Sequence, residues 1–283
     1  RKIAKHNSSL LYVPIPYIEM RFNMTLEVLV SAVNQQIRDL PERMHLESDA
    51  VIINQTDHFA YEEYKYQDNI IHGYNFAEKG VGLSRNNALL RAKGDIVLFS
   101  DEDIIYDAGY ADKVLKEFEK HPEADMVLFN IRVGESRATY YTEKFHRVHI
   151  WNAGRYPTYS FAVRRERLQA ANITFSLLFG GGAKYSNGED SLFLKDCLSY
   201  GFKVYATPVE LGAETEREST WFHGYHEKFF IDRGVLYHFL YGKLAGLMSV
   251  RFLMAHGKVM CQEIPGKKAL QLMKAGIRSV RGL

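Results

Sequence analysis

Three consecutive carboxylates, Asp101, Glu102 and Asp103, follow the short apolar run 95–100. Such a run is typical of a strand buried on both faces, and ligands in open α/β sheets bind at the carboxyl ends of strands. Adjacent carboxylates repel one another unless solvent or a cation neutralises them, and a hard divalent cation takes one or two carboxylates plus substrate phosphates. We expect a divalent cation on this acidic segment; the alternative is an acidic turn that leads into a helix.

A glycine-rich element, 80–88, reads GVGLSRNNA and precedes this strand. Arg85 falls near the start of a predicted helix, where backbone amides and a guanidinium can both face a phosphate. The alternative is a glycine-rich turn with a solvated arginine.

The glycine-rich segment 180–190 ends in a second acidic pair, Glu189 and Asp190. Ser186 and Glu189 have the spacing of a capping box, which gives Glu189 a structural role at a helix N-terminus. Asp190 is then left to face a cleft, although an Asp in a first helical turn also simply complements the helix dipole.

Short β-branched runs alternate with helical patterns, which predicts a mostly parallel sheet with covering helices. Strands are predicted at 26–33, 49–54, 69–74, 95–100, 124–131, 158–163 and 203–208. Helices are predicted at 82–94, 108–120, 164–171 and 189–201, and from about residue 229 the pattern is helical to the end.

The stretch 265–283 contains five basic residues and no acidic one. On a helical wheel its apolar residues gather on one arc: Ala269, Leu270, Met273, Ile277 and Val280, with Leu272 at the edge. The pattern predicts either contact with an anionic membrane surface through 266–283 or an apolar arc packed inside the protein.

The composition excludes several classes of protein. The chain of 283 residues is 46% apolar and 25% charged, as in soluble globular proteins. A net charge of only +2 argues against a nucleic-acid binder. The two cysteines have no pairing pattern, and no apolar run reaches membrane-spanning length, since 235–255 is interrupted by charged residues. We expect a cytoplasmic protein, because no cleavage site follows the proline-broken apolar stretch near the start.

From about residue 27 to 208, the order and spacing of these segments resemble the family 2 glycosyltransferases of the GT-A fold. The resemblance implies an α/β fold, Rossmann-like, with a mostly parallel central sheet flanked by helices and a C-terminal helical extension. We expect an N-terminal arm at 1–24, the GT-A domain at 25–225 and the extension at 226–283. The chain departs from the family pattern in lacking the P-T-Y-N ending of the first strand and in having Ser84 before Arg85.

The resemblance also implies roles for individual residues. The donor nucleotide is expected at Asn34, Gln35, Asp57, Arg85, Asn86, Asp101 and Glu102. Mn²⁺ or Mg²⁺ is expected on Asp101 and Asp103, with Glu102 and Asp103 as the other register of the motif. His223 is either a third ligand or a half-buried histidine in an aromatic segment. The catalytic candidates are Asp190 and Glu189, with Asp190 as the base.

The implied reaction is an inverting transfer of a sugar from a nucleotide-diphosphate donor to a hydroxyl of a glycan or a lipid-linked glycan. Two alternatives belong to other classes. A nucleotidyltransferase would need a glycine-rich loop after the first strand, which SAVNQQIRDLP lacks. A non-catalytic carbohydrate-binding protein would have lost carboxylates that are intact in this chain.

Overall fold

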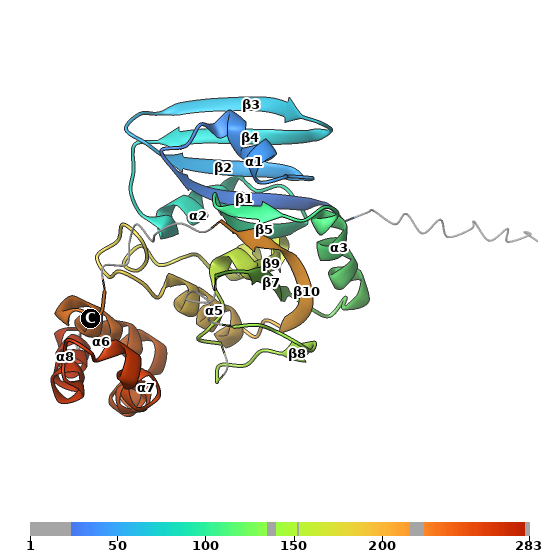
Figure 1. The fold of residues 1–283 in the computed structure, drawn as a ribbon. Helices are drawn as coiled ribbons and strands as arrows, with labels where there is room; N and C mark the ends of the chain where they lie inside the picture. Colours follow the sequence, from blue (N-terminus) through green and yellow to red (C-terminus); the bar gives the residue numbers. More distant parts are fainter. Residues whose placement is uncertain (1–23, 135–139, 152, 216–223, 281–283) are drawn as a thin grey trace, which may run out of the picture.

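The computed structural model describes residues 24–134, 140–151, 153–215 and 224–280 (Figure 1). Its strands are β1 (Leu26–Val33), β2 (Asp49–Gln55), β3 (Ala60–Tyr66), β4 (Asn69–Phe76), β5 (Ile96–Asp101), β6 (Ile104–Tyr106), β7 (Met126–Arg132), β8 (His146–Arg147), β9 (Phe161–Arg164) and β10 (Val204–Glu214). Its helices are α1 (Leu40–Arg43), α2 (Val81–Arg91), α3 (Tyr110–Lys120), α4 (Arg165–Ala171), α5 (Glu189–Ser199), α6 (Glu227–Tyr241), α7 (Ala245–Met260) and α8 (Gly266–Ser279).

The strands form one sheet in the order β3-β4-β2-β1-β5-β9-β7-β10-β6, with β8 paired to β10. Strands β4, β2, β1 and β5 run parallel, and so do β7 and β10. The predicted fold class is therefore confirmed. Antiparallel β9 lies between β5 and β7, and the strands β3, β6 and β8 were not predicted. Strand β3 escaped prediction because its sequence AYEEYKY is polar and largely exposed at the sheet edge.

The central strands are buried on both faces, as their unbroken apolar sequences predict. In β1, Val28 and Val30 face one core together with residues of α1 and α3. Leu29 faces the other core, with residues of α2, α4 and α5. The sheet is thus a layer between two sets of helices.

The three C-terminal helices, α6, α7 and α8, form a bundle beside the sheet (Figure 1). Its apolar core also takes in Phe179 and Leu192 from the segment around α5. The apolar arc of α8 points into this core: Ala269, Met273, Ile277 and Val280 are all buried. Of the two alternatives for this arc, packing inside the protein is the one observed. None of the helices in the described ranges is long and apolar enough to cross a membrane.

Two glycines set the close crossing of α6 and α8. A Cβ atom added to Gly234 would lie 2.1 Å from the carbonyl oxygen of Met273, and one added to Gly276 would lie 2.1 Å from that of Ile231. Contacts this short are impossible, so the two backbones can approach only because both positions lack a side chain.

We therefore predict that Gly276→Ala lowers the free energy of unfolding by about 1–3 kcal/mol, because the two helices must move apart. Gly257→Ala is the matched control, since its Cβ atom would meet only the Cys261 sulfur at 3.9 Å. That change should raise the free energy of unfolding by about 0.5–1 kcal/mol, the usual gain at a helix interior. Urea denaturation measures both, and equal stabilisation by the two substitutions would contradict the predicted crossing.

Candidate active site

The guanidinium of Arg85 joins the three segments that the sequence singled out. It lies on α2 and is only 4% exposed. Its Nη2 atom donates to Asp101 Oδ1 at 3.1 Å, at the carboxyl end of β5. Its Nη1 atom donates to Glu189 Oε1 at 3.2 Å and to Asp190 Oδ1 at 3.3 Å, both in the first turn of α5. One buried cation therefore holds three carboxylates in a single cluster.

Local packing fixes the position of α2. Ser84 donates its hydroxyl to Ser31 of β1 at 3.0 Å, directly beside Asp101 in the sheet register. The side chain of Asn86 exchanges two hydrogen bonds with the backbone of Phe175. The Phe175 ring in turn lies 5.4 Å from the Arg85 guanidinium carbon, within cation–π range. A Cβ atom on Gly82 would lie 2.4 Å from the Ser176 carbonyl oxygen, so only glycine permits this approach.

The antiparallel strand β9 brings a further group to the cluster. Because β9 runs opposite to β5 and β7, its first residue lies near their carboxyl ends. The 3₁₀ turn Thr158–Ser160 immediately before β9 therefore reaches the same edge. There the Thr158 hydroxyl donates a hydrogen bond to Asp190 Oδ1. No local pattern marks Thr158, and the prediction of a strand at 158–163 is wrong for this residue, which lies in the turn before β9.

The predicted capping box at α5 is wrong. Gly188 is the N-cap residue of α5, and no side chain caps the helix. The backbone amide and the hydroxyl of Ser186 both donate to Asp232 Oδ2 of α6, each at 3.1 Å. Glu189 turns to Arg85 instead. Asp232 is buried, and it ties the loop before the acidic pair to the C-terminal bundle.

The cluster has fewer positive than negative groups, and the pKa values respond to this. Burial and the neighbouring Asp190 raise the pKa of Glu189 to about 7, although Arg85 opposes the shift. Burial likewise raises the pKa of Asp190, against Arg85 and the Thr158 hydrogen bond. Burial alone would lower the pKa of Arg85, but Asp101 and its two companions outweigh it. The Asp190 side chain is 31% exposed and that of Glu189 only 11%, so Asp190 is the more accessible carboxylate.

The other predicted donor residues lie at the carboxyl ends of β1 and β2. Asn54, which is buried, accepts from the Gln35 amide at 3.0 Å and donates to the Gln35 carbonyl at 2.8 Å. These bonds shape the turn that contains Asn34, whose φ of 51° is left-handed. Asp57 is exposed, and a hydrogen bond from His58 lowers its pKa. The amide of Asn86 is engaged by Phe175, so its place in donor binding, like those of Asn34, Gln35 and Asp57, stays a prediction.

The acidic segment after β5 is held by backbone contacts. The Glu102 amide donates to the Ser31 carbonyl at 3.2 Å. The Asp103 carbonyl accepts from the Thr215 amide at 2.8 Å and from its hydroxyl at 3.1 Å. Among the described residues, no group of three or more His, Cys, Asp or Glu side chains is arranged to hold a metal ion. His223 lies outside the described residues, and His226 caps α6 by accepting from the Phe229 amide.

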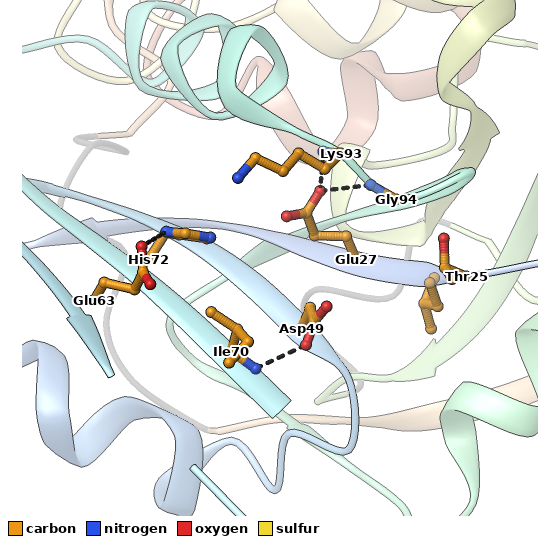
Figure 2. A pocket seen from close by; sticks show the side chains of 9 residues that line it. Thr25, Glu27, Asp49, Glu63, Ile70, His72, Lys93 and Gly94 are labelled. Atoms are coloured by element: carbon orange, nitrogen blue, oxygen red, sulfur yellow. Dashed lines mark hydrogen bonds and ion pairs between the residues drawn. The ribbon is translucent and has the colours of Figure 1, made fainter. Parts of the chain in front are cut away.

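A pocket of about 350 Å³ lies elsewhere, at the amino ends of β1 and β2 (Figure 2). Its lining includes Glu27, which accepts from the Lys93 and Gly94 amides, and His72, which is paired with Glu63. This pocket is at the opposite end of the parallel strands from Asp101. It is therefore separate from the acidic cluster.

We predict that Arg85→Met lowers the free energy of unfolding by about 3–5 kcal/mol at neutral pH, because it strands buried carboxylates. The loss should shrink at pH 5. With a pKa of about 7 in the folded protein and 4.5 ordinarily, Glu189 takes up its proton as the pH falls through 7, and below that it needs its cation less.

The control is Arg38→Met, which breaks an ion pair to Glu62 in which the Arg38 side chain is 68% exposed. Its cost should stay below about 1 kcal/mol. Urea denaturation at pH 5 and pH 8 gives both values. A loss for Arg85→Met no larger than that of the control would contradict the role given to the cluster.

Comparison with solved structures places the fold. S. aureus TarS 1-349 in complex with UDP-GlcNAc matches with a TM-score of 0.62 and 15% identity, covering 91% of this chain and 82% of that one. S. aureus TarS 1-349 in complex with UDP matches with a TM-score of 0.57 and 16% identity, over 85% and 74% of the two chains. The longer S. aureus TarS matches with a TM-score of 0.59 and 14% identity, over 91% of this chain and 49% of that one. At these identities the likeness concerns the fold.

The sequence comparisons concern the family. No curated protein matches the sequence. The sequence model described as Glycosyl transferase family 2 matches residues 20–180, which include Arg85 and Asp101 and are more than half of the chain. The expectation of an enzyme is thereby confirmed against that of a non-catalytic binding protein. The chain belongs to glycosyl transferase family 2.

Proposed function

We propose that this glycosyltransferase is an inverting, metal-dependent enzyme that transfers a sugar from a UDP-sugar to a hydroxyl of a glycan or a lipid-linked glycan. The observation that carries the proposal is the contact of Arg85 with Asp101 on one side and with Asp190 on the other. It sets Asp101, a carboxylate suited to hold a cation on the donor phosphates, next to Asp190, a carboxylate suited to take the proton of the acceptor hydroxyl. A nucleotidyltransferase, the alternative enzyme, has no comparable observation in its favour.

The donor side of the site is formed by the turn after β1 and by the acidic segment after β5. Asn34, Gln35 and Asp57 are proposed to meet the nucleoside. The structures of TarS with UDP-GlcNAc and with UDP support a uridine nucleotide for this chain. Arg85 itself is bonded to carboxylates, so we propose that it acts on the donor mainly by orienting Asp101.

Asp101 and Asp103 suit a divalent cation, Mn²⁺ or Mg²⁺. Both are carboxylates at the carboxyl edge of the sheet, and Asp101 keeps 29% of its side chain exposed beside Arg85. A carboxylate offers about four lone-pair sites, so the bonds from Arg85 leave Asp101 able to bind a cation. Two protein carboxylates together with phosphate oxygens are an ordinary ligand set for these ions. When bound, the ion would neutralise charge on the departing diphosphate.

Asp190 is proposed as the general base. In the reaction the acceptor oxygen bonds to the anomeric carbon, the bond from that carbon to the diphosphate oxygen breaks, and the acceptor proton passes to Asp190. The hydrogen bonds from Thr158 and Arg85 fix the orientation of this carboxylate. Its raised pKa brings its basicity closer to that of an efficient base at neutral pH.

The metal proposal predicts that Mn²⁺ increases the thermal stabilisation of the protein by UDP, and that Asp103→Ala abolishes this increase. A nucleotide at 100 times its Kd should stabilise the native state by about 2.7 kcal/mol, which thermal shift detects readily. Asp112→Ala is the control, because this carboxylate is exposed on α3, where it pairs with the exposed Lys116. Unchanged metal dependence in Asp103→Ala would show that the ion is held elsewhere.

The base proposal is tested by separating the two acidic neighbours. Asp190→Asn should lower kcat by about 10²–10⁴-fold with little change in UDP affinity. Glu189→Gln should be mild, because the carboxyl of Glu189 is already partly protonated near pH 7 and a Gln oxygen can still accept from Arg85. Kinetics of UDP release with an acceptor present measure both. The reverse pattern would make Glu189 the base.

We further propose the division at 25–225 and 226–283, after an N-terminal arm at 1–24, and a cytoplasmic location on the inner face of the membrane. The lipid-linked acceptor and the five basic residues of 265–283 motivate this location. The buried arc of α8 cannot be the part that enters the membrane while the bundle is folded.

A further inference from the structure

The C-terminal bundle is strongly basic. From the start of α6 to the end of α8, residues 227–279 contain nine of the 36 Lys and Arg residues of the chain and three of its 34 acidic residues, Glu227, Asp232 and Glu263. The cations are Lys228, Arg233, Lys243, Arg251, Lys258, Lys267, Lys268, Lys274 and Arg278. The net charge of the whole chain is small, but its C-terminal part carries a clear excess of positive charge. A positive surface attracts anionic partners.

Helix α7 adds an exposed apolar surface to this charge. Its inner side, with Ala245, Ser249 and Phe252, is buried in the bundle. Its outer side presents Leu247, 66% exposed, and Met254, 82% exposed. Leu247 and Met254 are seven positions apart, which is about two helical turns, so they lie on the same side of α7.

The same outer side carries cations. Arg251 and Lys258 are both exposed. Arg251 follows Leu247 by four positions and Lys258 follows Met254 by four, so the cations share the side of the apolar residues. Val250 lies beside them, and Lys243 and Leu244 precede the helix, all exposed. Neither α7 nor the turn 242–244 contains an acidic residue. We call this surface, Lys243, Leu244, Leu247, Val250, Arg251, Met254 and Lys258, the α7 ridge.

We propose that the α7 ridge binds the surface of an anionic lipid bilayer. Single exposed apolar residues are common on proteins, but here they are grouped and alternate with cations. Large apolar side chains enter the boundary of headgroups and acyl chains, while the cations meet lipid phosphates. The surface of an anionic bilayer offers a phosphate to every cation of the ridge. A protein surface with mixed charges would not.

The ridge is connected to the active site through α6. Helix α6 packs on α7, and its Asp232 holds Ser186, which precedes Asp190 by only four residues. A bilayer bound at the ridge would therefore lie against the bundle that supports the proposed base. The inference rests on the proposed function only where it brings the active site close to a lipid-linked acceptor. Binding of the α7 ridge to lipid does not depend on that function.

The test uses the full chain and vesicles of phosphatidylglycerol mixed with phosphatidylcholine, followed by sedimentation. Binding should be strong at low salt, weaken as salt rises and be lost with phosphatidylcholine alone. Leu247→Asp combined with Met254→Asp should reduce binding at least about tenfold, since both apolar contacts are replaced by repelled charges. Leu90→Asp is the matched control: Leu90 is 78% exposed on α2, and its replacement should leave binding unchanged.

A second comparison separates α7 from α8. Arg251→Gln with Lys258→Gln should weaken binding more than Lys267→Gln with Lys274→Gln, although each pair removes two charges. The opposite order, or full binding by the Leu247 and Met254 double variant, overturns the proposal. The proposal is also overturned if the intact chain does not bind vesicles and sedimentation velocity shows it to be a dimer that the Leu247 and Met254 double variant no longer forms. UDP should raise the melting temperature equally in all variants. If UDP stabilises none of them, the proposed function is wrong, whereas the result for vesicle binding stands independently.

Discussion

A single buried guanidinium facing three carboxylates is the constraint on which this structure depends. Transferring these charges from water is costly, and the cost is offset only if the hydrogen bonds of Arg85 are correctly formed. One positive charge cannot neutralise three negative ones, so burial leaves Glu189 and Asp190 with raised pKa values. Proton uptake by Glu189 near pH 7 lowers the surplus of negative charge that three carboxylates and one guanidinium would otherwise hold at the sheet edge. The negative charge that remains is the electrostatic counterpart of the proposed cation on the donor side.

The surrounding fold keeps this cluster in register. The parallel pairing of β1 with β5 positions Asp101, and α2 is held on the sheet by Ser84 and by the Asn86 amide. Around Asp190 and the loop before it, Thr158 and Asp232 approach from segments that are distant in sequence. The Asp190 carboxylate is thus held by Thr158 as well as by Arg85. Such support is what a base needs if it is to meet a hydroxyl in one orientation.

Much of this arrangement could be predicted from the sequence. The unbroken apolar strands predict the mostly parallel sheet, and the glycine-rich and acidic segments are the ones that contain Arg85, Asp101 and Asp190. The contacts among these residues are not predicted, because the sequence indicates a phosphate as the partner of Arg85. What failed depended on long-range contacts. The spacing of Ser186 and Glu189 is that of a capping box, so the sequence alone favours one. Ser186 instead donates to Asp232, a contact that depends on how α6 packs and has no local signal. Thr158 has no local signature, because its place follows from the direction of β9. The apolar arc of α8 was ambiguous until its packing partners were known.

The apolar core of the C-terminal bundle has a consequence for engineering. Phe179 and Leu192 belong to the catalytic half of the chain by sequence, yet they are buried among residues of α6 and α8. The bundle is therefore not an interchangeable module. A chimera that took only residues 227–279 from a relative would set a foreign surface against these two side chains and against the loop at Ser186. Recombination with a relative should instead take the segment 176–196 together with the helices, so that both halves of the shared core come from one parent.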